Sequence, residues 1–372
     1  MNLYEFQGKG VLQKAGIKVP AGKTISALSE LESALEVSGL PCVIKAQLLR
    51  GKRGKAGLIA SAESKEEAAE KARQIWDKEP HVETLLIEEK LDIESELYLS
   101  VMPEPHKAAA NMIISKEGGV DIEEVVADNP DSIITEQIPV LTGIMPYNIR
   151  NLVIPQKLEK TTAKSLGKVI KQLYSAFRTN DATLVEINPL IVTSDGDVVA
   201  ADAKVSIDDH ALYRQPFEQI QEGFTSEVEY EAAKEGIPYL QFDGDIGLMC
   251  AGAGLTNTVY DLIHYHGGEP ANFLEFGGPN YRKALQAMQL TLKSNPKVIL
   301  VVTFGTIARA DVMAEGIAEA MKQLKPEIPI VTAIRGTNEE KAAEILREVG
   351  LEPIQETEVA VQKAVELAAQ QS

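Results

Sequence analysis

The chain has 372 residues, more than a usual single domain, so two or more domains are expected. Its formal net charge of −18 argues against nucleic acid or an anionic membrane surface as the main partner. Two cysteines are too few for a disulfide framework, and no apolar run reaches the roughly 18 residues of a membrane span, so we expect a soluble, cytoplasmic protein.

The first half of the chain mixes helix and strand signals. Helical spacing of apolar residues, capping residues and glycine stops predict helices, whereas short apolar runs rich in β-branched residues predict strands. In chain order we expect a helix over 3–15, a helix over 28–37, a strand over 42–48 that contains Lys45, a helix over 64–76, strands over 84–88 and 107–115, and a helix over 160–177.

A basic, glycine-rich loop follows the strand that contains Lys45. Residues 50–55 hold four cations, and three glycines lie within 51–57. Glycine lets backbone amides approach an anion closely, and Lys and Arg supply the charge that phosphate needs. The loop does not fit the P-loop pattern, so a phosphate site and a solvated basic turn both remain open.

The strand over 84–88 ends on Glu88 and continues into an acidic segment. A chain that leads out through Glu88 to Leu91 can present main-chain groups to a flat base. Glu96 is then available for ribose hydroxyls. This is a hypothesis for a nucleoside site.

Residues 182–209 predict an antiparallel hairpin, because apolar and β-branched residues flank a turn-forming cluster at 194–197. Pairing about Asp195 places Glu186 opposite Lys204 and Asn188 opposite Asp202, so that all four side chains project from one face. A carboxylate beside an amide oxygen suits Mg²⁺, which takes one or two protein ligands and completes its shell with water and phosphate. The alternatives are a magnesium nucleotide site and an ordinary hairpin with one solvated face.

The order of predicted helices and strands changes after about residue 236, where we place a domain boundary. Four successive units of strand, glycine turn and helix begin at 246, 271, 298 and 328, which predicts a parallel, doubly wound sheet. The four turns then lie along the carboxyl edge, where such sheets bind ligands. The turns at 277–280 and 305–308 are candidate anion sites, since helix amino termini carry free N–H groups.

With these motifs assembled, the whole chain resembles the β subunits of the ADP-forming succinate–CoA ligase (succinyl-CoA synthetase) family. The resemblance runs nearly end to end and is carried by the segments 2–7, 53–57, 96–98, 117–123, 186–190, 211–216 and 267–274. It implies an α+β ATP-grasp domain over 1–235 and a flavodoxin-like, doubly wound α/β CoA-ligase domain over 236–372.

The resemblance also implies roles for individual residues. Lys45 and the loop Lys52, Arg53 and Gly54 would bind nucleotide phosphates, Glu88 and Leu91 the edge of the base, and Glu96 the ribose. Asn188 and Asp202 match the family's Mg²⁺ ligands, and Glu186 would help to orient an incoming phosphohistidine. The loops that face the acid and the phosphohistidine would contain Ala251, Gly277, Gly278, Thr306, Ile307 and Ala308.

In such a ligase the chain is one of two kinds of subunit, as αβ or α₂β₂. The partner α subunit would bind CoA and carry the phosphorylated histidine, which explains why none of the five histidines here has a catalytic or metal-ligand pattern. ATP and ADP, or GTP and GDP, with Mg²⁺ would phosphorylate that histidine. The phosphoryl group would then pass to a carboxylic acid and be displaced by CoA, as in the tricarboxylic acid cycle.

Several ligand loops depart from the succinate enzymes. Ala251 replaces an asparagine, Thr306 replaces a glycine, and Pro279-Asn280 stands where Gly-Ala is usual, while Lys52 and Leu58 replace glycines. Such changes alter hydrogen-bond donors and pocket volume, and so can change specificity. A citryl-CoA synthetase or other di- or tricarboxylate–CoA ligase subunit is therefore the alternative. An inactive nucleotide-binding paralogue and a stand-alone ATP-grasp carboxylate–amine ligase are less favoured.

Overall fold

The computed structural model describes residues 1–51, 53–120, 122–123, 127, 129 and 132–371. The chain forms two compact units, Met1–Glu222 and Gly223–Ser372. The division falls before the helix at Glu227–Lys234, whereas the sequence-based boundary at 235/236 falls after it. Within the described residues no helix is long and apolar enough to cross a membrane.

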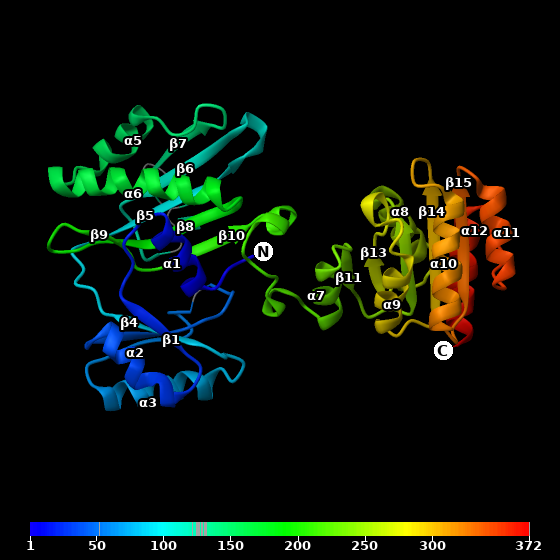
Figure 1. The fold of residues 1–372 in the computed structure, drawn as a ribbon, viewed down its shortest axis with the longest axis horizontal. Helices are drawn as coiled ribbons and strands as arrows, with labels where there is room; N and C mark the ends of the chain where they lie inside the picture. The colour runs from blue at the N-terminus through cyan, green and yellow to red at the C-terminus, as the bar shows by residue number, and fades with distance from the viewer. Residues whose placement is uncertain (52, 121, 124–126, 128, 130–131, 372) are drawn as a thin grey trace. The chain divides into compact units, whose positions relative to one another are not determined.

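The first unit contains a four-stranded antiparallel sheet in the order β1-β4-β2-β3; Figure 1 labels its strands β1 and β4 beside α2. Its strands are β1 (Gly22–Ile25), β2 (Cys42–Ala46), β3 (Ile59–Ala62) and β4 (Leu85–Glu89). Helices α2 (Leu31–Ser38) and α3 (Lys65–Lys78) cover one face. As the sequence predicts, Ser64 caps α3, and its hydroxyl accepts a hydrogen bond from the Glu67 amide at 3.2 Å.

The alternation of side chains along β2 decides where Lys45 lies. Cys42, Ile44 and Ala46 are fully buried in the core beneath α2 and α3. Because successive residues of a strand point to opposite faces, Lys45 lies on the face of the sheet away from these two helices. That face is the one on which the charged site is built.

The second sheet of this unit is larger. Its main path is β10-β8-β5-β6-β7, with β9 paired to β8. The strands are β5 (Ser95–Glu104), β6 (Ala109–Ser115), β7 (Ile133–Pro139), β8 (Ala182–Val192), β9 (Val198–Ala200) and β10 (Lys204–Ile207). Helices α1 (Glu5–Lys14), α5 (Pro146–Val153) and α6 (Lys160–Thr179) contribute side chains to its apolar core, and Figure 1 shows α5 and α6 lying along the sheet.

The second unit is a parallel α/β layer. Its sheet has the order β12-β14-β15, from β12 (Ile246–Ala251), β14 (Val298–Gly305) and β15 (Ile330–Gly336). One apolar core joins this sheet to α9 (Ala284–Lys293), α10 (Ala310–Leu324) and α11 (Glu339–Glu348), and another joins it to α8 (Ala253–Tyr265) and α12 (Thr357–Gln370). Helices on both faces confirm the predicted doubly wound class.

One predicted strand behaves differently from the other three. β13 (Asn272–Leu274) pairs in an antiparallel ladder with β11 (Tyr239–Gln241), and isolated parallel bridges link its flanks to β12. The pattern after this strand also predicts a helix from Tyr281; in the structure the helix begins at Ala284, after a 3₁₀ turn over Gly278–Asn280. The predicted strand, turn and helix are all present. The prediction that this strand joins the parallel sheet is wrong, because its three residues pair with an antiparallel strand. That partner, β11, follows α7 (Glu227–Lys234) in the chain.

Candidate functional site

The polar hairpin forms in the predicted register. Glu186 lies opposite Lys204, and on the turn side Leu190 lies opposite Ala200. Asn188 and Asp202 therefore occupy the facing positions between these two paired segments. A hydrogen bond of 3.2 Å from the Ala201 amide to the Pro189 carbonyl holds the strands together there. The hairpin thus brings an amide and a carboxylate to one place.

A buried cluster of charges lies beside this hairpin. It consists of three cations and three carboxylates, namely Lys9, Lys45, Arg53, Glu5, Glu88 and Asp202. Lys45 Nζ lies 3.0 Å from Glu5 Oε1 and 2.5 Å from Glu88 Oε1. Arg53 Nη1 lies 2.6 Å from Glu5 Oε2, and its Nη2 lies 3.2 Å from both oxygens of Asp202. Lys9 pairs with both Glu5 and Glu88.

The charges of this cluster depend on one another. Burial opposes ionisation of Glu5, but Lys45, Lys9 and Arg53 outweigh it and hold the pKa of that carboxyl well below its usual range. Burial likewise opposes the charged form of Lys45, yet the carboxylates of Glu5 and Glu88 raise its pKa. For Asp202, burial and the neighbouring Glu5 raise the pKa against the opposing effect of Arg53. The cluster is stable only as a balanced set of charges.

Asn188 is held by a loop from the neighbouring part of the sheet. Its Oδ1 accepts a hydrogen bond from the Gly119 amide at 2.7 Å, and its Nδ2 donates to the Val120 carbonyl at 2.8 Å. The same loop contacts Glu96, because a Cβ on Gly119 would lie 2.3 Å from Glu96 Oε2. The predicted ribose residue and one predicted metal ligand therefore meet at residues 118–120.

Asn188 and Asp202 together offer one amide oxygen and one carboxylate. Within the described residues, no group of three or more His, Cys, Asp or Glu side chains is placed to hold a metal ion. A two-ligand set of hard oxygens suits Mg²⁺ that completes its shell with water and phosphate oxygens. It does not suit a structural zinc or calcium site, which takes four or more protein ligands.

Glu186 has a partner that the sequence did not indicate. The hydroxyl of Tyr98, on β5, donates a hydrogen bond of 2.9 Å to Glu186 Oε2. Burial and the Glu186 carboxylate both raise the pKa of Tyr98 well above its usual range, so the phenol remains a donor. Tyr98 thereby fixes the carboxylate that we expect to face the phosphohistidine.

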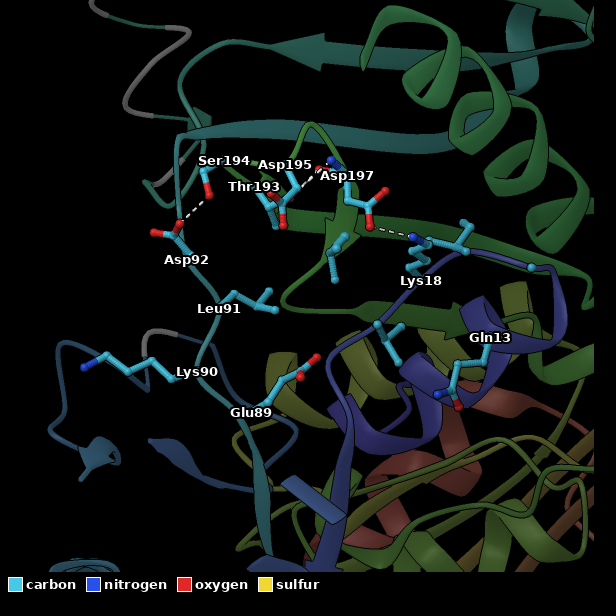
Figure 2. Close-up of a pocket in the computed structure, with 14 residues that line it drawn as sticks. Gln13, Lys18, Glu89, Lys90, Leu91, Asp92, Thr193, Ser194, Asp195 and Asp197 are labelled. Atoms are coloured by element: carbon cyan, nitrogen blue, oxygen red, sulfur yellow. Dashed lines mark hydrogen bonds and ion pairs between the residues drawn. The ribbon is translucent and has the colours of Figure 1, made fainter. Parts of the chain in front are cut away.

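A cavity of about 660 Å³ lies beside the segment that joins β4 to β5. It is lined by Glu89–Asp92, by residues 16–19 and by the turn of the hairpin, where Lys18 pairs with Asp197 and Ser194 contacts Asp92 (Figure 2). Leu91 is the one residue of the predicted nucleotide set among its lining. Glu88 instead directs its carboxylate to the lysines of the charged cluster.

The predicted phosphate loop contains Lys52, Arg53 and Gly54. Lys52 falls outside the described residues. Gly54 is exposed and its carbonyl accepts a hydrogen bond from the Gly57 amide at 2.9 Å, which closes the turn of the basic loop. Arg53, by contrast, pairs with Glu5 and Asp202 in the charged cluster.

The second unit brings its predicted loops to the carboxyl edge of the sheet. Ala251 ends β12 opposite Thr303 of β14, and Thr306, Ile307 and Ala308 follow β14. Glu275 braces two of the loops, because its Oε1 accepts hydrogen bonds of 2.7 Å from both the Gly252 and Gly277 amides.

Steric fit also holds these loops together. A Cβ on Gly277 would lie 2.5 Å from Glu275 Oε1 and 2.8 Å from the Gly252 nitrogen. The next residue, Gly278, has φ +53, a conformation that favours glycine. The loop after β14 is tied to β15 by the hydrogen bond from the Thr337 amide to the Gly305 carbonyl, 2.8 Å. The Ile307 side chain is 99% exposed, so this loop presents an apolar tip.

Sequence reasoning missed four residues of the site: Glu5, Lys9, Tyr98 and Glu275. Glu5 and Tyr98 lie within motifs that carried the family resemblance, over 2–7 and 96–98. That signal alone could have marked them for inspection. No pattern along the chain could have paired Glu5 with Lys45 and Arg53, which lie 40 and 48 positions away.

Comparison with known proteins gives two family matches. Residues 2–192 match the ATP-grasp domain family and residues 249–367 match the CoA-ligase family. The ADP-forming sulfoacetate–CoA ligase subunit SauC of Bilophila wadsworthia is 50% identical over 99% of both chains. The subunit SqwK from an Acholeplasma species, named for the same activity, is 49% identical over 99% of this chain and 92% of its own.

Other relatives carry a different name. The β subunit of ADP-forming succinate–CoA ligase from Rubrobacter xylanophilus is 40% identical over 99% of both chains. Among solved structures, ATP citrate lyase from Methanothrix soehngenii matches 99% of both chains with a TM-score of 0.74. At 20% identity, that likeness is one of fold alone.

Proposed function

Because the chain belongs to the ATP-grasp CoA-ligase family as a β subunit of an ADP-forming acid–CoA ligase, we propose that its acid substrate is a short sulfonated carboxylate, sulfoacetate. The relatives named for sulfoacetate are about 50% identical over essentially the whole chain, against 40% for those named for succinate. This difference is the observation that carries the proposal.

The altered loops support the same substrate. Sulfoacetate is one methylene shorter than succinate and replaces one planar carboxylate by a tetrahedral sulfonate with three acceptor oxygens. Ala251 and Thr306 both stand at the carboxyl ends of neighbouring strands, β12 and β14. Ala251 removes the amide of the usual asparagine, and Thr306 adds a hydroxyl and a methyl group where glycine is usual. Both changes alter the volume and the hydrogen-bond donors of the acid pocket. A pocket built on hydrogen bonds discriminates strongly between acids that do and do not satisfy them.

The chemistry requires two units with different tasks. In the first unit Lys45 and Arg53 neutralise the nucleotide phosphates, Leu91 lies beside the base, Glu96 is available for the ribose, and Asn188 and Asp202 would hold Mg²⁺. When bound, Mg²⁺ supplies charge neutralisation on the transferred phosphoryl group. Glu186, fixed by Tyr98 at 2.9 Å, orients the histidine of the partner α subunit.

The reaction is then a sequence of three displacements. A ring nitrogen of the partner's histidine takes the γ-phosphoryl group of ATP and ADP leaves. An oxygen of the acid's carboxylate attacks that phosphorus, which forms an acyl phosphate and frees the histidine. The thiolate of CoA attacks the acyl carbon, and inorganic phosphate leaves with the electron pair of the broken bond. The Gly277 amide is already bound to Glu275 Oε1, so the next amide of this loop, that of Gly278, is the N–H group that we assign to the anions of the later steps.

Succinate is the second candidate acid, since the succinate–CoA ligase β subunits align with 99% of this chain. In that case the enzyme would serve the tricarboxylic acid cycle. The likeness to ATP citrate lyase concerns the fold, so it does not favour citrate.

Partner-dependent ADP release distinguishes these acids. The co-expressed α and β subunits are supplied with ATP, Mg²⁺ and CoA, and with sulfoacetate, succinate, citrate or acetate at equal concentration. We expect kcat/KM to be highest with sulfoacetate, by a factor of about 100 or more over succinate. Equal or greater activity with succinate would overturn the proposal and make Ala251 and Thr306 neutral variation.

A further inference from the structure

Glu5 occupies the centre of the charged cluster. It is the first residue of α1, within the segment 2–7, and it is only 3% exposed. Its two oxygens lie 3.0 Å from Lys45 Nζ and 2.6 Å from Arg53 Nη1. These are the two described cations to which we assign the nucleotide phosphates. One carboxylate therefore binds both of them at once.

Lys45 has no donor left for a phosphate in this arrangement. Its ammonium group has three N–H donors. Its three near partners are Glu5 Oε1 at 3.0 Å, Glu88 Oε1 at 2.5 Å and the Ala201 carbonyl at 2.7 Å. A phosphate oxygen can bind Lys45 only if one of these contacts gives way, and the contact to Glu5 is the longest of the three.

Glu5 keeps a cationic partner when it releases Lys45 and Arg53. Lys9, one helical turn along α1, lies 2.8 Å from Glu5 Oε1. The carboxylate would keep this partner on its own helix, so its release does not leave a buried charge alone. The cluster also balances three cations with three carboxylates among its own side chains.

We propose that Glu5 is an internal counter-ion of the phosphate site: it pairs Lys45 and Arg53 while no nucleotide is bound, and yields both to a nucleotide phosphate. This inference rests on the proposed function, in which Lys45 and Arg53 bind phosphate. Glu5 acts through these two cations, so it is a positioning residue. This proposal gives a residue of the segment 2–7 a role in the phosphate site.

Removing the charge of Glu5 distinguishes a counter-ion from a carboxylate that only stabilises the fold. Removal of its charge would lower stability and either leave nucleotide affinity unchanged or weaken it. A counter-ion that competes with phosphate must instead give a tighter nucleotide complex when its charge is removed, because the unpaired cations then gain more from binding. Stability and affinity should therefore change in opposite directions.

The experiment measures binding of MgADP to the full-length chain by calorimetry, with the thermal midpoint recorded with and without MgADP. For Glu5→Gln we expect a Kd about tenfold lower than that of the wild type. We also expect a lower midpoint without nucleotide and a larger upward shift on adding MgADP. Glu32→Gln, which removes a carboxylate from the exposed pair with Lys65, is the matched control and should leave the Kd unchanged.

A second variant covers the case in which Glu5→Gln does not fold. Glu5→Gln combined with Lys9→Gln leaves Lys45 and Arg53 balanced by Glu88 and Asp202, so folding should be restored while the Kd stays below that of the wild type. A Kd equal to or above that of the wild type in the folded variant would overturn the role of Glu5. Failure of the wild-type chain to bind MgADP, or unchanged binding by Lys45→Met, would instead overturn the assignment of the phosphate site.

Discussion

The two candidate anion sites, one in each unit, are built by different means. In the first unit, Lys45 and Arg53 are 8% and 9% exposed, and both pair with the buried carboxylate of Glu5. In the second unit, the candidate contacts are backbone amides of glycine-rich loops, and the neighbouring side chains of Phe304 and Ile307 are 64% and 99% exposed. The first site should therefore be sensitive to loss of charge, and the second to added volume.

The largest effect should follow the loss of a cation from the first unit. Lys45→Met keeps most of the side chain's volume but leaves Glu5 and Glu88 with one lysine between them. We expect the rate of partner-histidine phosphorylation to fall by about 100-fold or more, and the free energy of unfolding to fall by about 3 kcal/mol. Phosphorylation assays with labelled ATP and denaturant titration measure the two changes.

Lys23→Met provides the matched control, since Lys23 is exposed on β1 and, within the described part of the chain, donates a hydrogen bond to Ser33 alone, at 3.0 Å. It should change neither quantity. If Lys45→Met phosphorylated the partner's histidine at a near-normal rate, the site of the first unit would not depend on side-chain charge, and the proposed difference between the two sites would be wrong.

A smaller but more selective effect should follow added volume in the second unit. Gly277→Ala would place a Cβ 2.5 Å from Glu275 Oε1, so the two braced loops must move apart. We expect acyl-CoA formation to fall by roughly 10- to 100-fold, because a misplaced site loses its geometry. Phosphorylation of the partner's histidine by ATP should remain within about twofold of normal.

Gly254→Ala is the control for this change, because a Cβ there meets no atom within 4 Å. It should be nearly silent in both half-reactions. An equal loss in both half-reactions for Gly277→Ala would mean that the loop supports the fold rather than the acyl site.

A moderate effect should follow loss of the hydroxyl that holds Glu186. Tyr98→Phe removes the 2.9 Å hydrogen bond to Glu186 Oε2 and leaves a carboxylate without its donor. We expect a roughly three- to tenfold slower phosphorylation of the partner's histidine and a loss of about 1 kcal/mol in unfolding free energy. Tyr147→Phe, at a half-exposed position on α5, should alter neither, and equal rates for the two variants would remove Glu186 from the reaction.

The smallest effect concerns pH and lies away from both sites. Hydrogen bonds from Arg214 and Gln215 lower the pKa of Asp181 to about 2 from its ordinary 3.8. Because the folded-state pKa is depressed, this contribution to stability is present above about pH 3.8 and is lost as the pH falls towards 2. Thermal midpoints of the wild type and Asp181→Asn should differ at pH 6 and converge near pH 2. A constant difference across that range would contradict the shift.

The sequence predicted the parts of the molecule that local patterns determine. The turn cluster at 194–197 correctly placed Glu186 opposite Lys204, and a short apolar run correctly placed Lys45 inside a strand. The recurrent strand, turn and helix units correctly indicated a doubly wound second unit. These features depend on neighbours in the chain or on one ladder, so periodicity and turn chemistry are sufficient to find them.

The parts that were missed depend on contacts between distant segments. Glu5 reads as an ordinary acidic residue at a helix start, and only the packing of α1 brings it to Lys45. Tyr98 reads as a β-former, and its hydroxyl meets Glu186 across 88 residues. β13 has the pattern of a parallel strand, but its antiparallel partner β11 is too short to stand out. Tertiary packing overrides local preference in each case.

The sequence separation between the parts of the charged cluster has a consequence for the order in which the first unit folds. Arg53 reaches Asp202 across 149 residues, and Lys45 reaches the Ala201 carbonyl across 156. During synthesis, the amino-terminal helix leaves the ribosome long before the hairpin that completes its surroundings exists. Contacts of such high sequence separation form slowly. The phosphate site should therefore be among the last features of its unit to mature, and a nascent chain that stops before residue 202 would hold its cations without their full set of counter-charges.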